Sequence, residues 1–104
     1  MHSTQQWDWG LSSAAQRALK SYSKEKKLVV EFERAINDIC ANPYAGRPKH
    51  GDLQGLWGWH VRWAGTTYCI AYSLNEAEHF VRIILLGAHE RFYDDLKIYI
   101  KSRL

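Results

Sequence analysis

The stretch WHVRWAGTTYCIAYS, residues 59–73, decides the fold because apolar residues recur at every second position over its first five residues. At its start the tryptophans and a valine fall on one side, while His60 and Arg62 fall on the other. A two-residue period is typical of a strand with one buried face. Residues 64–66 (AGT) predict a tight turn, and residues 67–73 return as a β-branched and aromatic strand. The stretch therefore predicts an antiparallel hairpin.

A further strand follows the hairpin directly. Residues 80–86 (FVRIILL) form the most apolar segment and predict a central strand that ends at Gly87. From about His89 the apolar residues recur at helical spacing, and they are Phe92, Leu96, Tyr99 and Ile100. We expect a strand that leads straight into a closing amphipathic helix.

The segment before the hairpin carries helical patterns. Residues 7–11 alternate and predict a short first strand, and Ser12 or Ser13 is a suitable N-cap for a helix over 14–22. Ser23 is a candidate cap for a second helix, whose apolar stripe comprises Leu28, Phe32, Ala35, Ile36 and Ile39. Asn42-Pro43 ends that helix, and residues 43–58 predict a loop.

These elements and the composition define the class of fold. With 104 residues, 46% hydrophobic and 24% charged, the chain predicts one globular domain, 1–104, rather than a disordered segment. The order β-α-α-β-β-β-α indicates an α+β fold, a mainly antiparallel sheet with helices packed on one face. A domain this small has little room for a deep cavity, so we expect no cofactor. The sequence has no apolar run of membrane-spanning length and no targeting signal, which predicts a cytoplasmic protein.

Residues that suit an anionic ligand gather in three segments, the loop 47–51, the first hairpin strand and the start of the last helix. Histidines, cations and a tyrosine make up this set: Arg47, Lys49, His50, His60, Arg62, His89, Arg91 and Tyr93. The net charge of +3 permits a polyanionic partner without requiring one. Each of these segments is also typical of a solvated surface, and that interpretation stays open here.

Histidines beside cations can cleave RNA through its own 2′-hydroxyl. The reaction needs a base for that hydroxyl, an acid for the leaving 5′-oxygen and positive charge around the phosphorane. A zinc site is the alternative use of His50, His60 and His89, but their spacings of ten and twenty-nine residues match no compact signature. Cys40 and Cys69 also lack a metal-ligand spacing, so the sequence predicts no metal site.

Three pieces of the chain, in this order, resemble the RelE/ParE superfamily of type II toxins. They are LQGLW at 53–57, the hairpin over 60–73 and IILLGAHERFY at 83–93. The resemblance implies a ribosome-dependent mRNA endoribonuclease with a cognate antitoxin, ribosome and mRNA as partners, no membrane and no small-molecule cofactor. The Gly-x-His-x-x-x-aromatic ending and the histidines are most similar to the YafQ-like branch.

The resemblance also implies roles by position. His89 would be the principal general acid or base, and His50 and His60 its partners, with acid and base unassigned. Tyr93 would stack on or orient the substrate. Phosphate contacts would come from the cations of the set, which are Arg47, Lys49, Arg62 and Arg91.

Two positions depart from the family pattern. Cys69 stands where RelE has a catalytic arginine, and a thiol cannot stabilise a phosphorane. Arg62-Trp63-Ala64 stands where a YafQ-like Asp-Trp pair would follow the strand histidine. Two alternatives therefore remain beside the nuclease, a ParE-like inhibitor of DNA gyrase without nuclease activity and a decayed, non-catalytic binding module.

Overall fold

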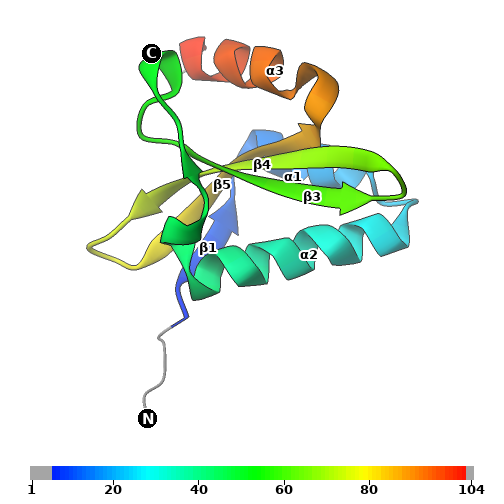
Figure 1. Cartoon of the computed structure of the whole chain (residues 1–104), viewed down its shortest axis with the longest axis horizontal. Helices are drawn as coiled ribbons and strands as arrows, with labels where there is room; N and C mark the ends of the chain where they lie inside the picture. Colours follow the sequence, from blue (N-terminus) through cyan, green and yellow to red (C-terminus); the bar gives the residue numbers. More distant parts are fainter. Residues whose placement is uncertain (1–5, 103–104) are drawn as a thin grey trace.

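The computed structural model describes residues 6–102 of the chain as a sheet with helices on both sides (Figure 1). The elements in chain order are β1 Asp8–Leu11, α1 Ser13–Ser21, α2 Lys26–Ala41, the short 3-10 helix η1 Pro43–Ala45, β2 Arg47–Pro48, the 3-10 helix η2 Gly51–Leu53, β3 Trp57–Trp63, β4 Thr66–Asn75, β5 Phe80–Ala88 and α3 His89–Lys101. The predicted α+β class and the order of its main elements are confirmed.

The five strands form one sheet in the order β1-β5-β4-β3-β2. Only the β1–β5 pair is parallel, and the other described pairs are antiparallel, as predicted. β5 is an interior strand and β4 takes the central position. The sheet therefore places β3, β4 and the end of β5 next to one another, although loops separate them along the chain.

The first face of the sheet is the main core. Helices α1 and α2 cover it, and their buried residues pack on the large side chains of the central strands, among them Val61, Tyr68, Ile70, Tyr72, Val81 and Ile83. Ser12 caps α1 as predicted: its hydroxyl accepts from the Ala15 amide at 3.0 Å and donates to the Ile84 carbonyl at 2.6 Å. This buried serine thus fixes the start of α1 to the sheet.

The prediction that all helices pack on one face is wrong for α3. Figure 1 shows α3 and α2 on opposite sides of the sheet. A second core joins α3 to the other face through Cys69, Ala71, Ile84, Phe92 and Leu96. Since neighbouring strand residues point to opposite faces, Cys69 and Ala71 face α3 while Tyr68 and Ile70 face the main core.

Three local predictions are also corrected. Ser23 does not cap α2, which begins at Lys26 after Glu25 with no side-chain cap. Gly87 does not end β5, because pairing of Cys69 with Gly87 and of Tyr68 with Ala88 continues the ladder by two residues. The predicted loop 43–58 contains β2 and both 3-10 helices, and its last two residues already belong to β3.

The predicted tight turn joins β3 and β4 through the two residues between them, Ala64 and Gly65. Both have positive φ, 51° and 81°, as a two-residue turn that matches strand twist requires. This turn sets the register in which His60 lies opposite Cys69.

None of the helices in residues 6–102 is long and apolar enough to cross a bilayer.

Candidate functional site

Sheet register gathers the candidate residues at one end of the α3 face. His60 on β3 pairs with Cys69 on β4, and Cys69 pairs in turn with Gly87 on β5. His89 follows Gly87 by two residues and is the first residue of α3. Tyr93 lies one helical turn further along α3. Residues that are distant in sequence therefore become neighbours across three strands.

The centre of the site consists of two histidines and a thiol. The Cys69 sulfur lies 3.2 Å from Nδ1 of His89. The rings of His60 and His89 are 5.8 Å apart and nearly perpendicular, at 85°. Both histidines are exposed, whereas Cys69 is only 1% exposed. Because Nδ1 of His89 is engaged by the sulfur, Nε2 is the nitrogen that can exchange a proton with a ligand.

The Cys69 thiol is held in its neutral form. Burial raises its pKa above the ordinary value, while a hydrogen bond from Tyr93 and the charge of Lys49 act weakly in the opposite direction. A buried thiol with a raised pKa is a poor nucleophile. The contact with His89 therefore positions the imidazole, and the structure gives the sulfur no sign of covalent chemistry.

Lys49 brings positive charge to the same place. Its Nζ donates to the Tyr93 hydroxyl at 2.9 Å and lies 4.7 Å from the centre of that ring. The Tyr93 ring is 5.8 Å from the ring of His89. Lys49 reaches α3 by crossing over Gly58, where a Cβ atom would stand 2.7 Å from Cε of the lysine. Glycine at 58 is therefore required for this path of Lys49.

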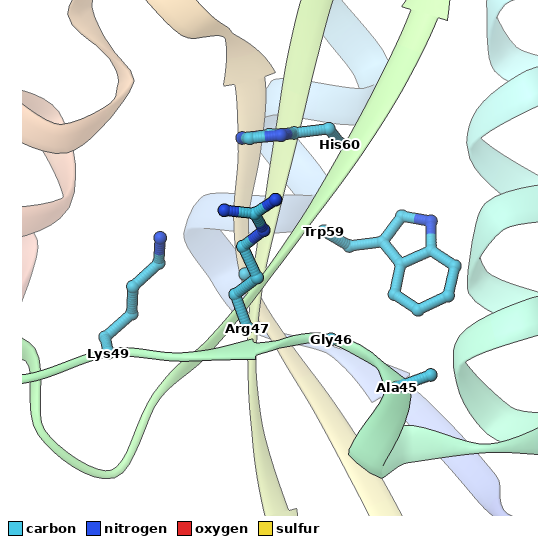
Figure 2. Close-up of a pocket in the computed structure, with 7 residues that line it drawn as sticks. Ala45, Gly46, Arg47, Lys49, Trp59 and His60 are labelled. Carbon is cyan, nitrogen blue, oxygen red and sulfur yellow. The ribbon is translucent and has the colours of Figure 1, made fainter.

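A cleft of about 210 Å³ opens beside His60, lined by Ala45, Gly46, Arg47, Lys49, Gly58, Trp59 and His60. Figure 2 shows Arg47, Lys49 and His60 projecting to the same side, while Trp59 points away from them. Partial burial lowers the pKa of His60, and the charges of His89, Lys49 and Arg47 lower it further. The site thus combines an imidazole that is neutral near pH 7 with two cations, an arrangement suited to a phosphate.

Five of the eight candidate residues are brought together, namely Arg47, Lys49, His60, His89 and Tyr93. The other three lie apart from this group. His50 is exposed at the start of η2, with no side-chain hydrogen bond or ring contact recorded within residues 6–102. Arg62 donates to Thr67 Oγ1 at 2.8 Å, and Arg91 lines a separate cavity against α1. Their functional roles stay predictions.

Sequence reasoning missed two contributors, Cys69 and Gly58. The sequence singles out Cys69 because it stands at the position of a family arginine, and it does not predict the contact with His89. The register of the hairpin could have placed Cys69 in the site, because a two-residue turn at 64–65 puts residue 69 opposite residue 60. The sequence places Gly58 at the end of a predicted loop. Its role depends on the path of Lys49, which no sequence pattern shows.

Comparisons with known proteins agree with this fold. The family described as "ParE-like toxin of type II bacterial toxin-antitoxin system" matches residues 11–97. No curated protein matches the chain. The toxin–antitoxin complex RelBE2 from Mycobacterium tuberculosis contains a chain with 24% identity and a TM-score of 0.63, over 82% of this chain and 100% of that one.

Two further solved structures are similar. A YoeB/ParE toxin from Agrobacterium tumefaciens has 16% identity and a TM-score of 0.66, over 79% of this chain and 98% of that one. A chain of the intact Escherichia coli RelBE toxin–antitoxin complex has 14% identity and a TM-score of 0.65, over 82% of this chain and 99% of that one. At these identities the likeness establishes the fold and leaves the activity to be argued from the site.

Proposed function

The chain belongs to the ParE-like toxin family of type II bacterial toxin–antitoxin systems, and we propose from its site that it is an mRNA endoribonuclease acting in the translating ribosome. The proposal places it on the RelE side of the RelE/ParE superfamily. Cleavage would use the 2′-hydroxyl of the RNA and no metal cofactor. The result would be an arrest of translation and of growth.

One observation carries the proposal: His60 and His89 face each other at 5.8 Å beside two cations, at the edge of an open cleft. Acid–base cleavage of RNA needs two proton-transfer groups on either side of one phosphate, together with positive charge. Residues 6–102 supply this set from β2, β3 and α3, with the intervening loop placing Lys49.

The lowered pKa of His60 suits it to be the base, since its unprotonated form persists at neutral pH. His60 would take the proton from the 2′-hydroxyl, whose oxygen then attacks the adjacent phosphorus. His89 would give a proton from Nε2 to the departing 5′-oxygen. The products are a 2′,3′-cyclic phosphate and a 5′-hydroxyl, and each imidazole ends in the protonation state opposite to its first.

The remaining residues of the site would bind and orient the RNA. Arg47 and Lys49 would balance the charge that develops on the phosphorane oxygens. Tyr93, held by Lys49 and packed against His89, would stack on a base or fix the ribose. Arg62, Arg91 and His50 lie outside this group, so any contribution of theirs would be to docking on ribosomal RNA.

The partners and location follow from the same proposal. Two of the similar structures are toxin–antitoxin complexes, which supports a cognate antitoxin as partner. A ribosomal target would place the protein in the cytoplasm. Binding to RNA phosphates through cations would weaken as salt is raised.

Two alternatives have a specific observation in their favour. The matching family is described as ParE-like, which favours inhibition of DNA gyrase without cleavage of RNA. Cys69, at the position of a family arginine, favours a decayed binding module. The facing histidines favour the nuclease over both, because neither alternative requires them.

Induced expression followed by primer-extension mapping of a reporter mRNA, with and without active translation, tests the proposal. We expect translation-dependent cuts, and a loss of about 1,000-fold in cleavage for His89→Ala. The control is His79→Asn, at the far end of β5 and about 30 Å away by strand length. Arrest with intact mRNA and an SOS response would support gyrase instead, and no arrest would support the decayed module.

A further inference from the structure

We infer that His60, Cys69 and His89 form a binding site for a transition-metal ion, Zn²⁺ best of all, and that an ion bound there switches the toxin off. The inhibitory half of this inference rests on the proposed nuclease function, and the binding half does not. Within residues 6–102 these three side chains are the group of histidine, cysteine and acidic residues placed to share an ion. The zinc site considered from the sequence comprised His50, His60 and His89 and did not include Cys69.

The distances suit a metal after a small adjustment. The ligand atoms of the three residues lie within 4.8 Å of one another, and the Cys69 sulfur is 3.2 Å from His89 Nδ1. Tetrahedral zinc, with bonds of about 2.0–2.3 Å, holds its donor atoms about 3.3–3.6 Å apart. The Cys69–His89 pair is already close to this spacing. His60 must move by about 1 Å, which its exposed side chain can do by rotation.

Strand pairing holds the backbone around the group, so the site would be largely preformed. β4 pairs with β3 at Cys69–His60 and with β5 at Cys69–Gly87, and β5 leads into α3 at His89. Each ligand thus comes from a different element of the sheet or from the helix that follows it. A thiolate with two imidazoles is a donor set that zinc, cobalt and copper prefer over magnesium or calcium.

The charges nearby set the strength of binding. Arg47 and Lys49 stand close to His60, and their charge opposes a cation. The charge of Lys49 also favours the thiolate of Cys69, and both cations would attract an anion to the fourth coordination position. We therefore expect a dissociation constant on the order of micromolar, weaker than closed structural zinc sites with four protein ligands.

A bound ion would stop the proposed reaction in two ways. It would take the ring lone pair with which His60 accepts a proton, and it would bind His89 at Nδ1, so that His89 could no longer become the imidazolium that donates from Nε2. It would also fix His89 to Cys69 and hold both rings away from substrate. Binding would release the thiol proton of Cys69 to solvent, and chelation would return that proton and the activity.

The binding test uses the full chain and needs no RNA. Zn²⁺ is titrated in competition with a chromophoric chelator, and Co²⁺ is added alone to record the thiolate-to-cobalt absorption band. We expect one ion per chain, and for Cys69→Ala a loss of the band with at least about 100-fold weaker binding. The matched control is Cys40→Ala, whose thiol is buried in the main core with a pKa raised to about 11.

A cobalt band that survives in Cys69→Ala, or zinc affinity unchanged in both Cys69→Ala and His60→Ala, would overturn the site. The activity arm adds Zn²⁺ and then a chelator to the RNA cleavage assay of the wild type and of His79→Asn, and both should be inhibited and restored. Cleavage that persists with the site saturated would overturn the inhibitory half. If no cleavage is seen at all, the proposed function fails while the titration still decides the metal site.

Discussion

The two faces of the sheet differ in the size of the side chains that β4 presents to them. Toward α1 and α2 it presents Tyr68, Ile70 and Tyr72, which are all buried in the main core. Toward α3 it presents Cys69 and Ala71. Each of these two has a glycine on one neighbouring strand, since Ala71 pairs with Gly58 and Cys69 with Gly87, and their other partners are Leu85 and His60. Large side chains fill one face, whereas β4 presents small residues to the other.

This difference explains where a functional site can form on so small a domain. Large side chains fill the space beneath α1 and α2, and close packing of this kind holds the strands in register. On the other side of the sheet the hollow is the cleft of about 210 Å³ beside His60, which Gly58 helps to line. Lys49 and His60 line this hollow, and the exposed His89 lies beside His60. The filled face thus gives rigidity, and the hollow face gives room for a ligand.

The largest effect on stability should come from the filled face. Ile70→Ala removes a fully buried side chain from the main core, and we expect a loss of about 3 kcal/mol in the free energy of unfolding. Urea denaturation measures this loss. The matched control is Ile98→Ala on α3, where the side chain is 67% exposed and the change should be within about 0.5 kcal/mol. Equal losses in the two variants would contradict the comparison.

The fold could be predicted well from the sequence because its signals are local. The two-residue period of the hairpin, the turn at 64–65 and the stripe of α2 each arise within a few neighbouring residues. The side of the sheet taken by α3 could not be predicted in this way. An amphipathic stripe shows that a helix is covered on one side, and does not show which face of a sheet covers it.

The site was predictable in part for the same reason. His60 and His89 stand out as polar residues at a strand face and at a strand end, so residue type alone marks them. Cys69 sits in an apolar run and looks like core, and only the cross-strand register shows its contact with His89. His50 shares its loop with Lys49, but η2 begins immediately after it and the side chain is left in solvent.

A substitution on the hollow face should reduce activity, whereas one on the filled face should reduce stability. Gly58→Ala places a Cβ atom 2.7 Å from Cε of Lys49, and the flexible lysine must move away from Tyr93. We expect cleavage to fall about tenfold, equivalent to about 1.4 kcal/mol, with the unfolding free energy changed by less than about 0.5 kcal/mol. Single-turnover cleavage and urea denaturation of the same preparation measure the two quantities.

A double variant identifies Lys49 as the route of that effect. If Gly58→Ala acts by displacing the lysine, adding it to Lys49→Ala should cause no further loss of cleavage. Additive losses would show that the methyl group itself fills the space that RNA needs. Either way glycine at 58 would be required, but additivity would remove Lys49 from the explanation.

A smaller effect is expected on the pH dependence. The pKa of His60 is lowered by partial burial first, and then by the charges of His89, Lys49 and Arg47. Because its pKa is lowered, His60 stays unprotonated, and so able to act as the base, down to a lower pH. The acidic limb of the kcat/KM profile should therefore lie below the pKa of an ordinary histidine. Arg47→Gln removes one positive neighbour, and we expect the pKa of His60 and that limb to move to higher pH. NMR titration of the His60 ring checks the shift directly.

Arg62→Gln is the control for that titration. Arg62 lies on the same strand as His60, but it is bonded to Thr67, and its charge does not contribute to the pKa of His60. Its removal should leave the titration of His60 unchanged. A shift of equal size in both variants would mean that the net charge of the protein, rather than the neighbours of the hollow, sets the proton affinity of His60.

The smallest effect is expected for His50, which the sequence does not distinguish from His60. The His60 ring lies 5.8 Å from that of His89, whereas the exposed side chain of His50 makes no ring contact with either histidine. His60→Ala should reduce cleavage by about 100-fold, in the range expected for loss of a general base. His50→Ala should reduce it by less than about threefold, the scale of one phosphate contact at the edge of a binding surface. A large loss in His50→Ala would mean that the loop 47–51 closes over the hollow when RNA binds, because a proton-transfer group must come within hydrogen-bond distance of the reacting atom.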